Sequence, residues 1–288
     1  MKFSIITVCF NAENHIEKTI ESVLKQKFED YEYIIVDGAS TDGTCGIIEK
    51  YSKAGENCAL KIRFVSEKDS GLYDAMNKGL KMAAGDYIEF LNAGDELLDE
   101  NTLENIAGKI EAHEKTQNSA ANTLFYGNIV YMNPDGSEDV RIYGKSCGKT
   151  IYFATGDCVN HQAIFAARDT FGLSCGIKAG SEAENVNDSK AYPFNFEEFK
   201  ICADRDWMMR ATKQGADWIA LNETVVKYDL ADESISVRDK ASLRVEEKKC
   251  LKVNYPLMVP VYSMFDFCRN NKTLAKMLHA VYEKLYIR

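Results

Sequence analysis

Short apolar runs alternate with stretches of helical periodicity from Phe3 to Leu91. This alternation limits the folds open to the chain more than any other feature. In the first helical stretch the apolar residues Ile16, Ile20 and Val23 recur every three or four positions. Strict alternation of strand and helix is typical of a parallel sheet with helices on both faces. We therefore expect an α/β fold, with strands at about Phe3–Cys9, Tyr31–Val36, Ile62–Val65 and Asp86–Leu91.

The second half of the chain lacks this regular alternation. Leu124–Met132 and Val140–Tyr143 flank Asn133–Gly136, a turn sequence typical of a hairpin. The polar stretch Gly176–Asn195 predicts an exposed loop, and Gly85 is expected to end the helix before the fourth strand. The remaining expected elements are a strand at Gln162–Ala166, a helix at Asp204–Gln214 and a last strand at Trp218–Leu221.

Two carboxylates directly follow expected strands. Asp37 ends the run that begins at Tyr33, and Asp95 follows the run that begins at Tyr87. In open α/β sheets, ligands bind just beyond the carboxyl ends of the strands. One acid there suits a ribose or a base edge, and a second suits a divalent cation that bridges phosphates, because hard cations take oxygen ligands. The pair predicts a nucleotide diphosphate held over the sheet.

Charge and cysteine content narrow the class of protein. The net charge of −9 and the sequence pI near 5.1 argue against a nucleic-acid partner. The nine cysteines are scattered without a CxxC pair and the four histidines are far apart, so we expect neither a zinc finger nor a disulfide framework. Reduced thiols favour a cytoplasmic location. No run approaches the roughly 20 apolar residues that a membrane-spanning helix needs.

Two common nucleotide-binding motifs do not fit this chain. Gly144–Thr150 resembles a P-loop, but three residues separate its glycines where four are required. The residues after the first strand, Phe10–Asn14, contain no GxGxxG sequence. A dinucleotide-binding Rossmann enzyme is therefore not expected.

Four motifs, in order along the chain, resemble the family 2 glycosyltransferases, which have the GT-A fold. They are Ile5–Asn11, Ser22–Gln26, Ile35–Thr44 and Ser66–Gly79. The last is similar to the branch that makes bacterial surface polysaccharides, and the resemblance extends from Phe3 to Tyr228. It implies a Rossmann-like mixed sheet and an inverting, metal-dependent enzyme. The implied reaction moves a sugar from a nucleotide-diphosphate sugar, expected to be a UDP-sugar, to a saccharide or lipid-linked acceptor.

The resemblance places the donor-binding residues near the strand ends. Asp37 is the implied nucleotide-recognition acid, since a carboxylate can accept from a uracil N3–H or a ribose hydroxyl. The alternative is a turn residue that satisfies its own backbone. Lys68 and Asp69 lie in a loop from which they reach the diphosphate or the base, unless they are simply solvated charges. The other residues implied on the donor side are Thr7, Phe10, Asn11, Asn77 and Asn92.

Asp95 is the implied ligand of a metal ion, Mn²⁺ or Mg²⁺. Here the chain departs from the family pattern, because Asn92–Asp95 contains one acid where the family has two or three. A sole carboxylate indicates a cation held mainly by the donor phosphates and water, as Mg²⁺ sites often are. The departure also supports an alternative function, a non-catalytic scaffold of the same fold that binds nucleotide sugars.

Two acids compete for the role of catalytic base. The family places an arginine six residues after the base, and Asp204 and Arg210 have this spacing. Asp206 is the rival, and Ala203 occupies the first position of the family's acidic dyad. The alternative for both acids is a favourable interaction with the dipole at a helix N-terminus. The residues implied on the acceptor side are Arg210 and the His-Gln pair His161 and Gln162, although His161 has a structural alternative.

The C-terminal part of the chain differs in charge from the rest. From Arg244 to Arg288, nine basic and four acidic residues give a net charge of +5, which leaves −14 for the remainder. We expect a glycosyltransferase domain at residues 1–231 and a helical tail at residues 232–288. The tail packs on the body, forms a homodimer contact or lies peripherally on the inner face of the cell membrane, as basic amphipathic segments do.

Overall fold

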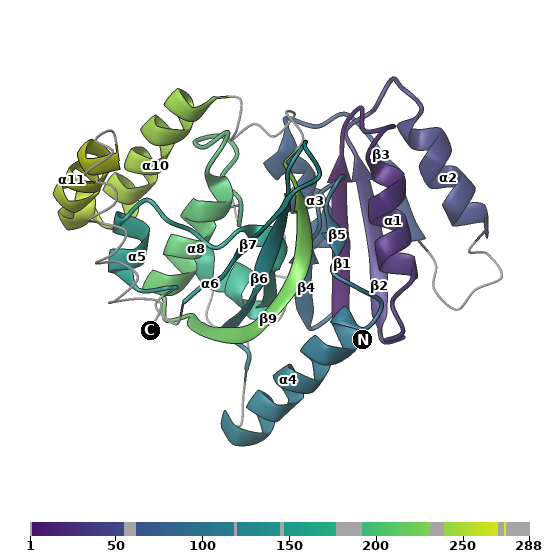
Figure 1. The fold of residues 1–288 in the computed structure, drawn as a ribbon, viewed down its shortest axis with the longest axis horizontal. Helices are drawn as coiled ribbons and strands as arrows, with labels where there is room; N and C mark the ends of the chain where they lie inside the picture. The colour runs from purple at the N-terminus through teal and green to yellow at the C-terminus, as the bar shows by residue number, and fades with distance from the viewer. Residues whose placement is uncertain are drawn as a thin grey trace.

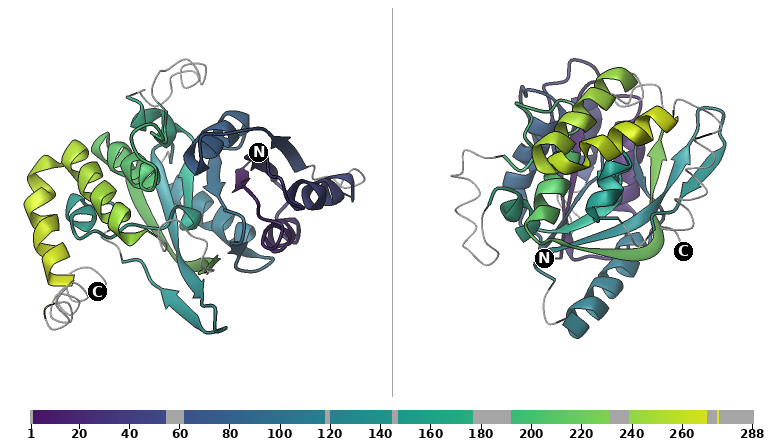
Figure 2. Two further views of the ribbon diagram at one scale, coloured as in Figure 1. Left: turned by 90° about the horizontal axis from the view of Figure 1, so that it is seen from above. Right: turned by 90° about the vertical axis from the view of Figure 1, so that its left-hand side faces the viewer.

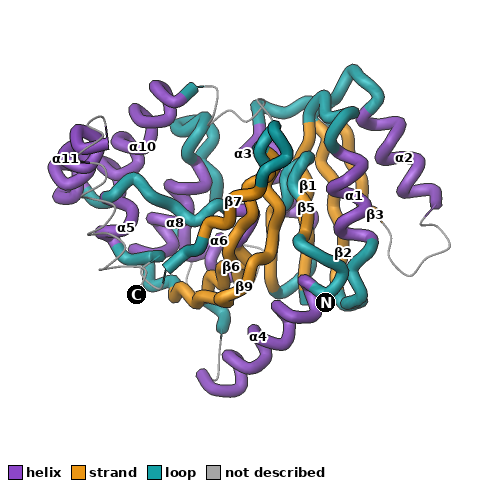
Figure 3. Tube along the Cα trace, viewed as in Figure 1, coloured by secondary structure: helices purple, strands orange, loops and turns teal. Residues whose placement is uncertain are grey.

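One mixed sheet runs through the molecule and carries helices on its faces (Figure 1). The structure is a computed structural model that describes residues 2–54, 62–117, 120–144, 147–176, 192–230, 239–269 and 274. Within these residues the strands follow the order β3-β2-β1-β4-β8-β6-β9-β5, with β7 paired to β6. Figure 3 shows this sheet in orange between two groups of helices. The predicted α/β class with a mixed sheet is confirmed.

The first half of the chain forms the parallel part of the sheet. Strands β2, β1 and β4 lie side by side, and β3 extends the sheet beyond β2. The strands are β1 (Phe3–Cys9), β2 (Tyr31–Asp37), β3 (Ile62–Ser66) and β4 (Tyr87–Phe90), and the helices are α1 (Ile16–Leu24), α2 (Thr44–Ala54) and α3 (Leu72–Met82). These bounds confirm the expected strands to within about a residue or two at each end.

Helices α1 and α3 cover opposite faces of this parallel region. Side chains alternate along a strand, so neighbouring positions face opposite sides. Tyr31 faces α1, where its hydroxyl donates to the carbonyl of Val23 over 2.8 Å. Ile6 faces α3, where a Cβ added to Gly79 would lie 2.5 Å from Ile6 Cγ2. Figure 1 shows α1 in front of the sheet and α3 behind it.

Gly85 has a different role from the one expected. Helix α3 ends at Met82, and its C-cap is Ala83 in an extended conformation. Gly85 instead lies against the start of β1, where an added Cβ would be 2.6 Å from the backbone carbon of Phe3. The glycine therefore permits a close approach of two backbones, and the prediction that it ends the helix was wrong.

The second half adds strands of mixed direction. Strand β8 runs antiparallel to both β4 and β6, while β9 runs parallel to β6 and antiparallel to β5. The predicted hairpin is confirmed by the antiparallel β6–β7 pair. The strands are β5 (Glu96–Leu97), β6 (Thr123–Met132), β7 (Glu138–Arg141), β8 (Ile164–Ala167) and β9 (Asp217–Asp229).

Strand β9 is much longer than the predicted Trp218–Leu221. The prediction stopped where polar residues interrupt the apolar run. In the structure Asn222 takes a left-handed conformation with φ of 55°, and the β6–β9 register shifts nearby. An irregularity of this kind lets a strand continue past a break in its sequence pattern. The continuation brings Tyr228 and Asp229 to the carboxyl end of the sheet.

Helices fill the space beyond the second half of the sheet. On α8, Trp207 stacks on Phe171 of α6 with ring centroids 4.7 Å apart, which fixes the start of α8. The remaining described helices are α4 (Thr102–Gln117), which lies apart from this group in Figure 1, α5 (Thr150–Ala154), η2 (His161–Ala163), α6 (Asp169–Ser174), α8 (Ala203–Lys213), α10 (Lys240–Asn254), η3 (Pro256–Met258) and α11 (Val259–Arg269). The expected helix near Asp204–Gln214 is confirmed. Most of the expected loop at Gly176–Asn195 lies outside the described residues.

The described part of the tail is packed against the body. Glu247 of α10 forms an ion pair of 2.8 Å with Arg205 of α8, and both side chains are buried. The carboxylate of Glu246 accepts hydrogen bonds from the backbone nitrogens of residues 200–202. Residues 231–238 lie outside the described part, as does the segment after Leu274. The division of the chain at residue 231 stays a prediction.

Candidate functional site

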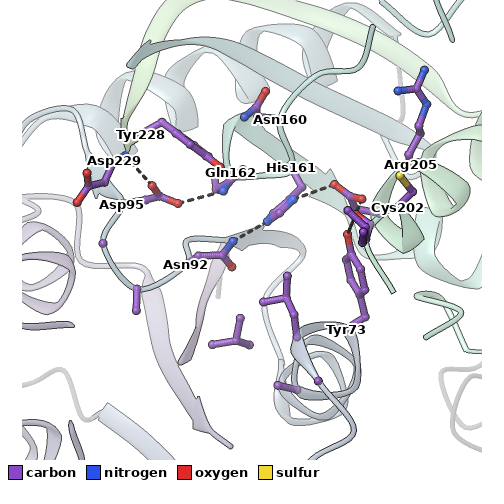
Figure 4. A pocket seen from close by; sticks show the side chains of 18 of the residues that line it. Tyr73, Asn92, Asp95, Asn160, His161, Gln162, Cys202, Arg205, Tyr228 and Asp229 are labelled. Atoms are coloured by element: carbon purple, nitrogen blue, oxygen red, sulfur yellow. Dashed lines mark hydrogen bonds and ion pairs between the residues drawn. The ribbon is translucent and has the colours of Figure 1, made fainter. Parts of the chain in front are cut away.

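A cavity of about 1310 Å³ lies at the carboxyl ends of the parallel strands. Its walls come from the loops after β1, β3 and β4, from η2, and from the first turns of α8 and α10. Nine of the residues predicted from the sequence line it: Phe10, Asn11, Lys68, Asp69, Asn92, Asp95, His161, Gln162 and Asp204. Figure 4 shows part of this cavity, where side chains from separate elements converge.

The loop after β1 is tied to the loop after β2. Asn11 has a left-handed backbone with φ of 49°, its amide nitrogen donates to Ser40 Oγ over 2.7 Å, and its Oδ1 accepts from the Thr41 nitrogen over 2.9 Å. The neighbouring Phe10 ring is 62% exposed at the edge of the cavity. An exposed aromatic ring on a fixed loop offers a flat surface on which a base can stack.

Asp37 lies beneath this loop pair and is fully buried. Its carboxylate accepts hydrogen bonds from Ser66 Oγ over 2.6 Å, from the Ser40 nitrogen over 2.9 Å and from Ser40 Oγ. Burial opposes ionisation, but these hydrogen bonds outweigh it and hold the pKa of Asp37 below its usual value. These contacts are those expected if Asp37 is a turn residue, the alternative to a role in nucleotide recognition. Its neighbour Gly38 lines the cavity, and a nucleotide role for Asp37 stays a prediction.

Lys68 and Asp69 also line the cavity, in the loop after β3. Asp69 Oδ1 accepts from the Gly71 nitrogen over 2.9 Å, which fixes the loop before α3. A Cβ added to Gly38 would lie 2.6 Å from Asp69 Oδ2, so the glycine permits the close approach of the two loops. This end of the cavity thus contains the positive charge of Lys68 and the negative charge of Asp69.

Two residues predicted on the donor side lie within the packed interior instead. Thr7 is fully buried, with its Oγ1 3.0 Å from the Tyr33 hydroxyl. Asn77 forms paired hydrogen bonds with the backbone of Phe194, from Nδ2 to the carbonyl over 2.8 Å and from the Phe194 nitrogen to Oδ1 over 3.1 Å. Neither is among the described residues that line the cavity.

Asp95 is held from two sides within the cavity. Its Oδ2 accepts from Gln162 Nε2 over 3.0 Å, and its Oδ1 accepts from the Asp229 nitrogen over 3.0 Å (Figure 4). Burial raises the pKa of Asp95 to about 7, although both hydrogen bonds act in the opposite direction. The Asp229 carboxylate pairs with Lys18 Nζ over 2.6 Å. Strand β9, which sequence reasoning ended too early, therefore supplies a contact to the predicted metal ligand.

The oxygen atoms near Asp95 fit a cation that takes most of its ligands from a bound donor. Asn92 Oδ1 is buried, lies in the loop that leads to Asp95, and has no hydrogen-bond partner among the described residues. Carboxylate and amide oxygens are suitable ligands for Mg²⁺ or Mn²⁺. No group of three or more His, Cys, Asp or Glu residues within the described chain is arranged to bind a metal ion. The protein alone thus provides an incomplete set of ligands.

Asp204 is the centre of a hydrogen-bonded network at the start of α8. Its Oδ1 accepts from the Tyr73 hydroxyl over 2.8 Å, and its Oδ2 lies 3.0 Å from His161 Nδ1. The other ring nitrogen, His161 Nε2, is 3.0 Å from Asn92 Nδ2. Burial opposes the charge of Asp204, but the contacts with His161 and Tyr73 prevail and keep its pKa below the usual value. Asp204 is therefore an ionised carboxylate at neutral pH.

Asp206 and Arg210 lie outside this network. Asp206 is buried, with Oδ2 paired to Arg210 Nε over 2.7 Å and Oδ1 accepting from Asn254 Nδ2 over 2.8 Å. Arg210 also donates to the carbonyl oxygens of Ser174 and Pro193. Neither residue is among the described residues that line the cavity. Of the two candidate bases, Asp204 is the one that lines the cavity together with residues predicted on the donor side.

Several cavity residues were missed by sequence reasoning. Tyr73 binds Asp204 across 131 positions of sequence, so no local pattern indicates the contact. Arg141 and Asp157 both line the cavity and form an ion pair of 3.0 Å. Arg205 also lines the cavity. Its position directly after Asp204 was the only feature of the sequence that could have indicated this.

The sheet and the arrangement of loops around the cavity define a GT-A fold, and similar solved structures support this assignment. The structure of TarS from S. aureus in complex with UDP-GlcNAc has a TM-score of 0.61 at 18% sequence identity, covering 92% of this chain and 71% of that one. The mannosyltransferase PcManGT from Pyrobaculum calidifontis in complex with GDP-Man and Mn²⁺ has a TM-score of 0.52 at 14% identity, covering 97% of this chain and 79% of that one.

Sequence comparison gives the family. Residues 4–170, more than half of the chain, match the family described as Glycosyl transferase family 2, and the chain belongs to this family. A PGL/p-HBAD biosynthesis glycosyltransferase of Mycobacterium bovis is 32% identical over 170 residues, which are 59% of this chain and 60% of that protein. The chain thus matches less than two thirds of that relative's length.

Proposed function

We propose that this protein is an inverting glycosyltransferase that moves a sugar from a UDP-sugar to an acceptor hydroxyl. The main support is that one cavity contains the predicted donor-binding loops, the predicted metal ligand and the ionised carboxylate of Asp204. Membership of glycosyl transferase family 2 supports the reaction class. The UDP-GlcNAc complex of TarS, whose fold is similar, supports a uridine nucleotide.

Asp204 is the base in this proposal. The acceptor oxygen attacks the anomeric carbon while the bond from that carbon to the diphosphate breaks, and the diphosphate leaves with the electron pair. The acceptor proton passes to the carboxylate of Asp204. Tyr73 and His161 each occupy one position on that carboxylate, but each oxygen can accept a second hydrogen bond. The carboxylate is thus oriented and still able to take a proton.

His161 and Tyr73 are positioning residues in this proposal, because they act on Asp204. His161 also contacts Asn92, which belongs to the loop that leads to Asp95. The orientation of the base is thereby linked to the loop of the predicted metal ligand. On the donor side, Phe10 and Asn11 would contact the base and ribose, while Lys68 would meet the diphosphate.

Asp95 and Asn92 are the residues that would hold a divalent cation. The unpartnered oxygen of Asn92 and the carboxylate of Asp95 supply two hard donor atoms, and the diphosphate would supply others. When bound, such a cation neutralises negative charge on the leaving diphosphate. PcManGT, which shares the fold and carries Mn²⁺ in its complex, supports this choice of cation.

The acceptor is a saccharide or a lipid-linked saccharide for a surface polysaccharide. The cavity continues beyond Asp204 to Lys240 and Leu243 of α10, which leaves space for a sugar chain on the side away from Phe10. None of the described helices combines the length and apolar character that a membrane crossing requires. A cytoplasmic location is proposed on a separate ground, because the scattered cysteines without a CxxC pair favour reduced thiols. Any membrane contact would then be made from the surface. A homodimer remains a further proposal.

The test uses the full chain with a panel of UDP-, GDP-, dTDP- and CMP-sugars. A UDP-sugar with Mn²⁺ should raise the melting temperature, EDTA should remove most of that effect, and slow release of UDP should follow without an acceptor. The scaffold alternative, motivated by the single acid in Asn92–Asp95, predicts donor binding with no release of nucleotide. If none of the donors binds under either condition, the nucleotide-sugar proposal is wrong.

A further inference from the structure

An exposed apolar stripe lies along η3 and α11. Leu257, Pro260, Met264 and Phe267 follow one another at intervals of three or four residues, which places them on one side of a helix. All four are exposed, with Leu257 at 86%, Phe267 at 70% and Met264 at 54%. Large apolar side chains gathered in this way usually mark a contact surface.

The opposite side of α11 is anchored, so the stripe cannot turn inward without breaking contacts. Tyr262 is buried, and its hydroxyl donates to Glu247 Oε2 over 2.7 Å. Glu247 is in turn paired with Arg205 of the body. The outward direction of the stripe is therefore fixed by a buried polar network. Figure 2 shows α10 and α11 together on one side of the molecule, facing the viewer in the right-hand view.

Helix α10 packs against η3 and α11, and its exposed side has an excess of positive charge. Exposed Val245 and Val253 lie beside Lys248 and Lys252. Neither lysine has a carboxylate partner among the described residues. The acids of α10 and α11 are all engaged elsewhere: Glu246 with the backbone of residues 200–202, Glu247 with Arg205, and Asp266 with Arg244 at 3.6 Å.

We propose that η3, α11 and the outer side of α10 form a docking surface for an anionic lipid bilayer. Apolar side chains flanked by lysines suit the boundary between acyl chains and negative headgroups. A second copy of this chain fits less well, because a symmetric contact through this surface would bring the unpaired lysines of both copies together. This inference concerns location and does not depend on the sugar-transfer proposal.

Vesicle flotation of the full chain tests the proposal. The probes are phosphatidylcholine vesicles with and without phosphatidylglycerol. The parent protein should float with the anionic vesicles and much less with the neutral ones. The triple variant Leu257→Ser, Met264→Ser, Phe267→Ser should bind the anionic vesicles at least about tenfold more weakly, because three apolar groups no longer enter the bilayer. Lys248→Gln with Lys252→Gln should weaken binding mainly at low salt.

Val140→Ser with Ile142→Ser is the matched control, since both residues are exposed apolar side chains, one in β7 and one directly after it. This control should float like the parent. The melting temperature of each variant checks folding, and light scattering reports mass. Failure of the parent to float, or equal flotation of the triple variant, would overturn the proposal. A dimer that the triple variant abolishes, without vesicle binding by the parent, would assign the surface to a second copy instead.

Discussion

Asp204 is a buried carboxylate whose two oxygens contact a phenol and an imidazole from distant parts of the chain. At the scale of single residues, this contact set distinguishes it from Asp206, two positions later. Asp206 meets a guanidinium and a carboxamide inside the packed body. The two acids belong to one helix turn, yet one faces the cavity and the other neutralises Arg210.

Asp204→Asn should therefore abolish most of the transfer while leaving donor binding nearly intact. General-base contributions are typically about 10²–10⁴-fold, and the loss should appear in kcat rather than in affinity for the nucleotide. Single-turnover assays with calorimetry of UDP binding measure the two effects separately.

Asp206→Asn is the control for that variant. It breaks the buried pair with Arg210, which typically costs roughly 3–5 kcal/mol of stability. The protein that remains folded should keep its transfer rate. If Asp206→Asn were the inactive variant and Asp204→Asn the active one, the assignment of the base would be reversed.

Tyr73→Phe should move the acid limb of the pH–rate profile to higher pH. The hydroxyl of Tyr73 donates to Asp204 and helps to hold its pKa below the usual value. Without that donor the carboxylate keeps its proton to higher pH, and the base must lose its proton before it can act. The profile of kcat/KM against pH measures the shift. A purely structural role for Tyr73 would change stability and leave the limb in place.

At the scale of secondary-structure elements, two buried acids on β2 and β4, the strands on either side of β1, have opposite environments. Glu89 of β4 is fully buried, and neither carboxylate oxygen has a hydrogen-bond partner among the described residues. Glu32 of β2 is also buried, but it accepts from Ser4 Oγ over 2.6 Å and pairs with Arg63 over 2.9 Å. Burial raises the pKa of Glu89 well above 4.5. For Glu32 the hydrogen bonds outweigh burial and lower the pKa.

In the Glu89→Gln variant, the free energy of unfolding should fall less steeply with rising pH than in the parent. Glu89 keeps its proton in the folded protein, whereas the unfolded chain loses it near pH 4.5. Its contribution is thus complete below that pH and is lost as pH rises through the folded pKa. Urea unfolding between about pH 5 and pH 9 should show a smaller slope for the variant than for the parent.

Glu32→Gln is the matched comparison with the opposite sign. The lowered pKa of Glu32 contributes stability above the unfolded value of 4.5, and that stability is lost as pH falls through the folded pKa. This variant should be less stable than the parent at neutral pH, and the difference should shrink in acid. If the stability of both variants changed with pH in the same way, Glu89 and Glu32 would not have opposite environments.

The elements of the first half were predictable because each is encoded locally. The run Tyr31–Val36 is apolar except for Glu32, and Ile16, Ile20 and Val23 recur at helical spacing. The extent of β9 was not predictable, because its second part depends on pairing with β6 across a shifted register. Cavity residues at strand ends, such as Asn92 and Asp95, could be named from the sequence. The contact of Tyr73 with Asp204 could not, since only the complete fold brings them together.

At the scale of the whole molecule, the tail and the body share a buried ion pair. Arg205 Nη1 lies 2.8 Å from Glu247 Oε1, and Arg205 also donates to the carbonyl oxygens of Phe153 and Gly156. These contacts join α10, α8, α5 and the loop between α5 and η2. The helix that begins the tail therefore forms part of the same packed structure as the body.

Glu247→Gln should lower the stability of the entire chain by roughly 3–5 kcal/mol, because it leaves Arg205 buried without a countercharge. We expect a single cooperative transition at a lower urea concentration, measured both by tryptophan fluorescence and by far-ultraviolet circular dichroism. Two separate transitions would instead support the division at residue 231 into a domain and an independent tail.

Helix α10 has the cavity on one side, at Leu243 and Glu247, and the proposed lipid surface on the other, at Val245 and Lys252. An α-helix with its side chains is about 10–12 Å thick. A sugar attached directly to a headgroup would have to pass around this wall to reach Asp204, and each added sugar unit extends the reach. If both proposals hold, the enzyme would select acceptors by the distance between the carrier lipid and the accepting hydroxyl. The thickness of α10 would then set the minimum length of a lipid-linked acceptor.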